Sequence, residues 1–235
     1  MPDNPKISMK PLVLFDIDET LTTEMGHPDA FRHAFRMVYN TDTQQPPEGN
    51  PGMTDQQIIS EILLEKGLDK QEILDKMSIC MEEMADFYEN SITDRDVELY
   101  DGVPEVLAEL KKRGVLMGLV TGNVERIAWS KLKKAGIADY FRVGGFGSDD
   151  PERAELVRIA IKRAEDIGFR PADSNENVFV IGDTPKDIYA GKAAGTKTIG
   201  VASGKYPIGE LKKAGADFVL DNLKDMQKIL GIILG

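Results

Sequence analysis

The chain has 235 residues, which is enough for one large domain or for a domain that carries an insertion. Hydrophobic residues make up 41% of it and charged residues 29%, values typical of a soluble globular protein. The net charge of −11 argues against a protein that binds nucleic acid through clustered lysines and arginines, and no apolar run is long enough to span a membrane. The single cysteine, Cys80, excludes an internal disulfide, and the acidic N-terminus is unlike a signal peptide, so we expect a cytoplasmic protein.

The first predicted element is a buried parallel strand at residues 11–16, because this run is almost continuously apolar. The segment that follows shows helical patterns and loops but no strand pattern. Helices are predicted at residues 31–39, 54–67 and 70–89. The third helix carries an apolar stripe, formed by Ile73, Met77, Met81 and Met84. We interpret this segment as an all-helical insertion with a core of its own.

Strands and helices alternate through the rest of the chain. Strands are predicted at residues 115–120, 141–143, 178–181, 197–201 and 217–220. Helices are predicted at residues 101–113, 124–135, 151–167, 186–194, 207–214 and 223–230. Such alternation implies right-handed crossovers and a parallel sheet.

Two pairs of aspartates follow predicted strands. Asp16 and Asp18 end the first strand, and Asp183 and Asp187 follow the strand at 178–181. Open α/β sheets bind ligands at the carboxyl ends of their strands, so the four carboxylates meet if the two strands are neighbours. Two unit charges about 4 Å apart repel by roughly 4 kcal/mol at an effective dielectric near 20, and a divalent cation would offset that repulsion. Oxygen ligands without a nearby histidine or cysteine favour Mg²⁺.

Three segments resemble motifs I, II and IV of the haloacid dehalogenase superfamily. They are Phe15–Leu21, Val120–Asn123 and Ile181–Asp187. Residues 182–204 are also similar to the phosphoglycolate phosphatase branch. The resemblance implies an α/β fold with a Rossmann-like parallel sheet, helices on both faces, and a helical cap inserted after the first strand. It predicts a core domain at 1–22 and 96–235 and a cap domain at 23–95.

The resemblance also assigns roles to the aspartates. It implies that Asp16 is the nucleophile, which forms an aspartyl-phosphate, and that Asp18 is the general acid and base. The implied Mg²⁺ ligands are Asp16, Asp18 through its backbone carbonyl, Asp183 and Asp187. For Asp187, a helix first-turn residue favoured by the helix dipole is a nearly equal alternative. Asp18 favours phosphoryl transfer, because the dehalogenase branch lacks this second aspartate.

Motif II predicts the phosphate-binding group. Thr121 offers a hydroxyl, while Gly122 and Asn123 offer backbone N–H groups just before a predicted helix. The resemblance implies that these residues hold the transferring phosphoryl group. The alternative is that Thr121 or Asn123 is a simple helix N-cap.

Motif III departs from the family pattern, because no lysine occupies residues 147–156. Arg153 is the best replacement, since a guanidinium can bridge Asp16 and phosphate oxygens. Lys186 is the second choice, and the alternative for Arg153 is a solvated helix residue. In the insertion, four residues follow motif I closely and could face a substrate: Glu24, His27, Arg32 and His33. We expect the two histidines at the surface.

Together these features predict a magnesium-dependent phosphatase that acts on a small phosphorylated metabolite, either phosphoglycolate-like or a sugar phosphate. Two alternatives stay open: a sugar-phosphate mutase of the same family and a non-catalytic protein that binds a phosphorylated metabolite. Neither nucleic acid nor membrane is an expected partner, and both a monomer and a homodimer are compatible with the sequence.

Overall fold

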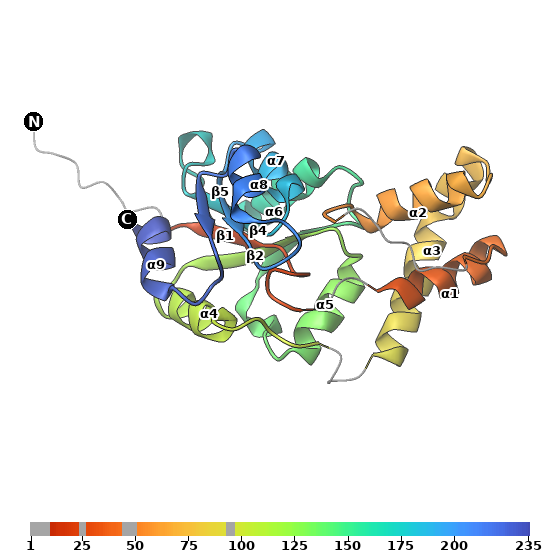
Figure 1. The fold of residues 1–235 in the computed structure, drawn as a ribbon, viewed down its shortest axis with the longest axis horizontal. Helices are drawn as coiled ribbons and strands as arrows, with labels where there is room; N and C mark the ends of the chain where they lie inside the picture. Colours follow the sequence, from red (N-terminus) through yellow and green to blue (C-terminus); the bar gives the residue numbers. More distant parts are fainter. Residues whose placement is uncertain (1–9, 24–26, 44–50, 93–96) are drawn as a thin grey trace, which may run out of the picture.

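The computed structural model describes residues 10–23, 27–43, 51–92 and 97–235, and it contains one six-stranded parallel sheet (Figure 1). The strands follow the order β3-β2-β1-β4-β5-β6, which confirms the predicted parallel α/β architecture. Their bounds are β1 Leu12–Phe15, β2 Leu116–Thr121, β3 Val143–Phe146, β4 Val178–Gly182, β5 Lys197–Val201 and β6 Phe218–Leu220. The first strand of the chain therefore lies at the centre of the sheet, where the order reverses.

The register brings the carboxyl ends of three strands to one level. Phe15 at the end of β1 lies opposite Leu119 of β2 and Ile181 of β4. The next residue, Asp16, still donates its backbone N–H to Ile181 O at 2.9 Å. Polar residues that follow these strands are thus placed side by side at one edge of the sheet.

Each face of the sheet is covered by its own helices. Val13 and Phe15 pack in one apolar cluster with helices α4, α5 and α9, whereas Leu12 and Leu14 pack in another with α6 and α7. This division follows from the alternation of side chains along a strand that is buried on both faces. The bounds are α4 Val103–Lys112, α5 Glu125–Lys134, α6 Arg153–Asp166, α7 Pro185–Ala193, α8 Ile208–Lys213 and α9 Met226–Leu234.

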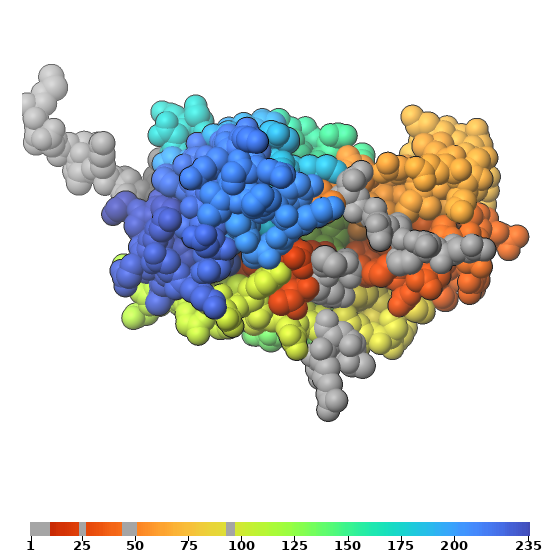
Figure 2. All heavy atoms as spheres, in the orientation of Figure 1, coloured from red at the N-terminus to blue at the C-terminus, as the bar shows by residue number. Residues whose placement is uncertain are grey.

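Three helices between β1 and α4 form a separate group, which we call the helical region (Figures 1 and 2). They are α1 Pro28–Tyr39, α2 Asp55–Glu65 and α3 Lys70–Ser91. Their apolar side chains form a cluster that also takes in Val124 and Ile127 at the start of α5. The second of these helices begins with a capping box, in which Thr54 and Gln57 are partners. The predicted domain boundaries fall next to or within residues outside the described ranges, and they stay a prediction.

Two predicted elements were placed wrongly. The strand predicted at 141–143 lies farther along the chain, at Val143–Phe146, and includes Gly144 and Gly145. A Cβ on Gly145 would lie 2.0 Å from Leu156 O, so glycine lets α6 approach the strand closely. The helix predicted at 223–230 begins only at Met226, where Asp225 accepts a hydrogen bond from the Lys228 N–H, and continues to Leu234.

No helix among the described residues is long and apolar enough to cross a membrane.

Candidate active site

Three carboxylates from distant parts of the chain meet at the carboxyl edge of the sheet. Asp16 follows β1, Asp183 follows β4, and Asp187 lies in the first turn of α7. Each offers one oxygen, and these oxygens all lie within 4.8 Å of one another. All three residues are buried, at 6%, 2% and 1% exposure. The expected convergence of the two aspartate pairs is therefore confirmed for these three residues.

Arg153 at the start of α6 joins two of these carboxylates. Its Nη2 lies 2.7 Å from Asp16 Oδ1 and 2.5 Å from Asp187 Oδ1. Arg153 is only 7% exposed, so the alternative of a solvated helix residue is wrong. Lys186 is half-buried and forms no ion pair with the described carboxylates of the cluster. The guanidinium of Arg153 thus takes the place for which the family pattern has a lysine.

One guanidinium does not balance three buried carboxylates. Burial raises the pKa of Asp16 to about 7, the charges of Asp187 and Asp18 add to the rise, and Arg153 opposes it. Burial likewise raises the pKa of Asp183 to about 9, with Asp187 and Asp16 contributing. The pKa of Arg153 is itself raised: burial alone would lower it, but Asp187 and Asp16 more than offset that. The three carboxylates thus outnumber the one guanidinium that pairs with them among the described residues.

Asp187 combines the two interpretations that the sequence left open. Its Oδ2 accepts hydrogen bonds from the Thr184 N–H at 3.0 Å and from the Thr184 hydroxyl at 2.7 Å, as the N3 residue of a capping box. Its Oδ1 pairs with Arg153. The capping box fixes the side chain through Oδ2, while Oδ1 takes part in the carboxylate cluster.

The side chain of Asp18 lies outside the carboxylate cluster. Lys131 Nζ is 2.6 Å from its Oδ1, and Asn123 Nδ2 donates to its Oδ2 at 3.0 Å. The side chain keeps 23% of its surface exposed. A place for Asp18 among metal ligands would therefore depend on its backbone carbonyl, as the family resemblance implies.

The motif II residues form a buried polar turn after β2. Thr121 is fully buried, and its Oγ1 accepts hydrogen bonds from Asn123 Nδ2 at 2.7 Å and from the Asn123 N–H at 3.3 Å. The N-cap alternative for Thr121 and Asn123 is wrong, because Val124 is the N-cap residue of α5. The N–H of Val124 donates instead to Asp55 Oδ2 at 2.8 Å.

The helical region contacts this turn directly. The N–H of Asp55, the first residue of α2, donates to Gly122 O at 2.8 Å. A Cβ on Gly122 would lie 2.2 Å from Met53 O, so only glycine permits this approach. His27 Nε2 lies 3.0 Å from Asp55 Oδ2, and His27 is 6% exposed. The expectation of a surface position is therefore wrong for His27, which is held by a buried carboxylate.

The other candidates in the helical region lie farther from the cluster. His33 pairs with Glu83 at 2.9 Å and stays about one-third exposed. Arg32 pairs with Asp29 on its own helix at 3.1 Å. Glu24 lies outside the described residues.

Two functional candidates were missed in the sequence, Lys131 and Asp55. Lys131 falls on the apolar face of α5 with Ile127, Ala128 and Leu132, and a lysine at a core position is a recognisable signal. Asp55 follows the capping residue Thr54, which made it look like an ordinary first-turn acid.

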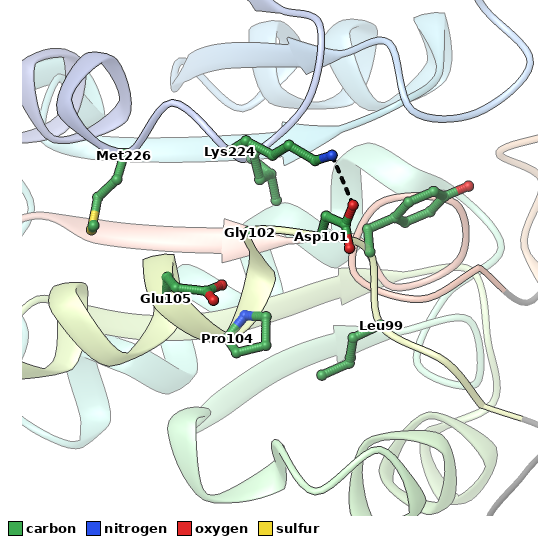
Figure 3. A pocket seen from close by; sticks show the side chains of 9 residues that line it. Leu99, Asp101, Gly102, Pro104, Glu105, Lys224 and Met226 are labelled. Atoms are coloured by element: carbon green, nitrogen blue, oxygen red, sulfur yellow. Dashed lines mark ion pairs between the residues drawn. The ribbon is translucent and has the colours of Figure 1, made fainter.

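Two adjoining surface hollows lie beside the site. The larger, of about 480 Å³, is bordered by the first turns of α4 and α9 and by an ion pair of 2.7 Å between Asp101 and Lys224 (Figure 3). It includes no member of the carboxylate cluster. The second, of about 420 Å³, reaches Thr20, whose hydroxyl donates to Asp183 Oδ1 at 3.3 Å.

Comparisons with known proteins agree with this geometry. The model of the haloacid dehalogenase-like hydrolases matches residues 13–201. The pyrophosphatase PpaX of Bacillus mycoides is 29% identical over 228 residues, which cover 95% of this chain and 98% of the relative. A phosphoglycolate phosphatase of Vibrio vulnificus is 28% identical over 232 residues, covering 93% and 95%.

A solved structure shows the same fold. The crystal structure of a hydrolase from Pseudomonas syringae superimposes with a TM-score of 0.68 at 22% identity, covering 95% of this chain and 99% of that one. The family match spans most of the sheet and all three motifs, from Asp16 to Asp187. The chain belongs to the haloacid dehalogenase-like hydrolases and is a phosphatase of that family.

Proposed function

We propose that the protein is a magnesium-dependent phosphatase that hydrolyses a small phosphorylated metabolite through an aspartyl-phosphate on Asp16. The observation that carries the proposal is the buried cluster of Asp16, Asp183 and Asp187, with Arg153 bound to Asp16. A carboxylate at the tip of a central strand, beside a guanidinium, is placed to attack a phosphoryl group that the guanidinium attracts.

The residues present fit a hard divalent cation. All three donor groups of the cluster are carboxylates, the ligand type that Mg²⁺ prefers. Burial, and after it the neighbouring carboxylates, raises the pKa values of Asp16 and Asp183 although Arg153 opposes the rise, which supports a further cation at the cluster. Asp16, Asp183 and Asp187 would hold the ion, together with the backbone carbonyl of Asp18. The ion would supply charge stabilisation to the phosphoryl oxygens.

The reaction would proceed in two displacements. A carboxylate oxygen of Asp16 attacks phosphorus, and the bond from phosphorus to the leaving oxygen breaks, while Asp18 gives that oxygen a proton. Asp18 then takes a proton from water, whose oxygen attacks the aspartyl-phosphate and releases phosphate and the Asp16 carboxylate. Arg153, Thr121 and the backbone N–H groups of Gly122 and Asn123 would hold the phosphoryl oxygens in both steps.

The substrate is proposed to be small. The first turn of α2 packs directly on the motif II turn through Asp55 and Gly122, which leaves little room for a polymer above the phosphate site. Two relatives are named for phosphoglycolate and for pyrophosphate hydrolysis, so these two compounds come first among the candidates to test.

The test is phosphate release from a panel of phosphomonoesters and pyrophosphate, with Mg²⁺ or with a chelator, for the wild type and Asp16→Asn. We expect release that needs Mg²⁺ and is abolished in Asp16→Asn, together with a phosphoryl group on Asp16 in mass spectra of acid-quenched wild type. Asp166→Asn, on the exposed end of α6, is the matched control and should keep full activity. Hydrolysis that survives in Asp16→Asn, or that needs no metal, would contradict the proposal. Turnover that appears only with a bisphosphate primer would indicate a mutase.

A further inference from the structure

Lys131 is a buried cation to which none of the family motifs assigns a role. It lies on α5, and its side chain is 0% exposed, unlike the neighbouring Lys133, which is exposed. An ammonium group is seldom buried without a charged partner, because removal from water disfavours the charged form. Among the residues that the structure describes, Asp18 is a charged partner of Lys131, and its Oδ1 lies 2.6 Å from Lys131 Nζ.

The carboxylate of Asp18 is held at both of its oxygens. Lys131 donates to Oδ1, and Asn123 Nδ2 donates to Oδ2 at 3.0 Å. Two donors on opposite oxygens fix the plane of the carboxylate as well as its position. Asp18 is nevertheless 23% exposed, so the fixed carboxyl group is still accessible from solvent.

The same ammonium group also contacts the helical region. Lys131 Nζ lies 5.9 Å from the centre of the Tyr88 ring, and Tyr88 is a buried residue of α3. A cation over an aromatic face is attracted by the ring quadrupole. Lys131 therefore lies between Asp18 of motif I and α3 of the helical region.

From this geometry we infer that Lys131 is a positioning residue for proton transfer: it holds the Asp18 side chain in the orientation in which the protonated carboxyl group gives its proton to the leaving oxygen and becomes the carboxylate. This inference rests on the proposed function, since it takes Asp18 as the general acid. Lys131 pairs with the side chain of Asp18, whereas the carboxylates of Asp16 and Asp187 pair with Arg153, so we expect substitution of Lys131 to act on proton transfer more than on metal binding.

The experiment compares two esters that differ in their need for a proton. A p-nitrophenolate leaves without protonation, whereas an alkoxide needs the proton of Asp18. Values of kcat/KM, which report the first displacement, are measured for p-nitrophenyl phosphate and for the best alkyl phosphate of the panel. The variants are Lys131→Met, Lys131→Arg and Asp18→Asn, with Lys133→Met as the matched control on the same helix.

We expect Lys131→Met to lower kcat/KM for the alkyl ester by about 100-fold, the lower range of a general-acid contribution, and to change the aryl ester far less. Lys131→Arg should restore part of the loss, and Lys133→Met should match the wild type. An equal fall for both esters would reduce Lys131 to a structural role and overturn the inference, as would wild-type rates for both.

The double variant Lys131→Met, Asp18→Asn completes the test, and it removes both charges of the pair, so it avoids an unpaired charge if a single variant does not fold. We expect it to be no slower than Asp18→Asn alone, because Lys131 acts through Asp18. A further fall would overturn the inference. Failure of the proposed function is a separate result: in that case Asp16→Asn would keep its activity, whereas here Asp16→Asn is inactive and only the comparison of esters fails.

Discussion

At the carboxyl edge of the sheet, Arg153 is the guanidinium shared by Asp16 and Asp187, and Asp183 lies beside them. In the helical region, by contrast, the buried Asp55 meets the Val124 N–H and His27, both at its Oδ2. Burial, together with the neighbouring carboxylates, raises the pKa values of Asp16 and Asp183 in the first arrangement, and Arg153 opposes that rise without cancelling it. In the proposed function the sheet edge takes up a cation and a phosphoryl group, and the contacts of Asp55 hold the motif II turn in place.

Arg153→Ala should produce the largest effect on this comparison. Removing the guanidinium takes away the donor nearest to Asp16 and leaves two buried carboxylates without their partner. We expect kcat/KM to fall by about 100-fold or more, as for the loss of a donor in an oxyanion hole. Steady-state kinetics with Lys186→Ala as the control would decide between the two cations. A small loss in Arg153→Ala with a large one in Lys186→Ala would move the phosphate-binding role to Lys186.

Metal binding should depend on pH through the raised pKa values. In the metal-free protein the pKa of Asp16 is raised from 3.8 to about 7 and that of Asp183 from 3.8 to about 9. A folded-state pKa above the unfolded value gives stability that is fully present below about pH 4 and is lost as the pH rises through the folded-state pKa. The metal-free protein should therefore lose stability between about pH 5 and pH 9.

Mg²⁺ should restore that stability where the carboxylates are ionised. Mg²⁺ at a concentration of 100 times its dissociation constant adds about 2.7 kcal/mol to the free energy of unfolding. Because the ion binds the ionised carboxylates, the Mg²⁺-induced rise in Tm should be larger at about pH 8.5 than at about pH 5.5. Differential scanning calorimetry with Mg²⁺ and with a chelator measures it. Asp183→Asn should lose most of the rise. An equal rise at both pH values would show that the ion does not bind at these carboxylates.

Asp55→Ala tests the other side of the comparison. The Val124 N–H would lose its acceptor, and an unsatisfied buried donor costs about 1–3 kcal/mol. We expect that loss in the free energy of unfolding, measured by urea denaturation and Trp129 fluorescence, together with a lower kcat because the motif II turn is less well held. Asp69→Ala is the matched control: it removes an exposed cap of α3, where Asp69 accepts from the Gln71 N–H at 2.8 Å. This control should lower stability by about 1 kcal/mol and leave kcat unchanged. An unchanged kcat in Asp55→Ala would limit Asp55 to a role in stability.

These two sides were not equally predictable from the sequence. Asp16 and Asp183 each follow an apolar strand, and the parallel order of the strands then places them together, so local pattern and topology suffice. Arg153 was also predictable, because it is the best replacement for the lysine that motif III lacks. The contacts of Asp55 and Lys131 depend instead on how α2 and α5 pack, over 69 and 113 residues of chain, and no local periodicity encodes such pairs. The bounds of β3 were misplaced for a similar reason. The strand contains glycines, and glycine is needed there because α6 approaches the strand closely.

Substitution of Arg126 should have the smallest effect on stability. It tests whether ion pairs or apolar packing hold α3 against α5. Its guanidinium on α5 meets three carboxylates of α3 at 2.7–2.8 Å: Glu82, Asp86 and Glu89. The arginine side chain is 39% exposed, so water and salt screen these pairs, and exposed ion pairs contribute about 0–1 kcal/mol. We expect Arg126→Ala to lower the free energy of unfolding by less than about 1 kcal/mol, and the difference from wild type to shrink in 1 M salt.

Arg158→Ala, which removes an exposed pair within α6, is the control for loss of a surface arginine. Because Val124 and Ile127 already join the apolar cluster of the helical region, the contact should persist without Arg126. A loss of several kcal/mol that salt does not reduce would mean that the arginine, and not the apolar cluster, holds α3 against α5.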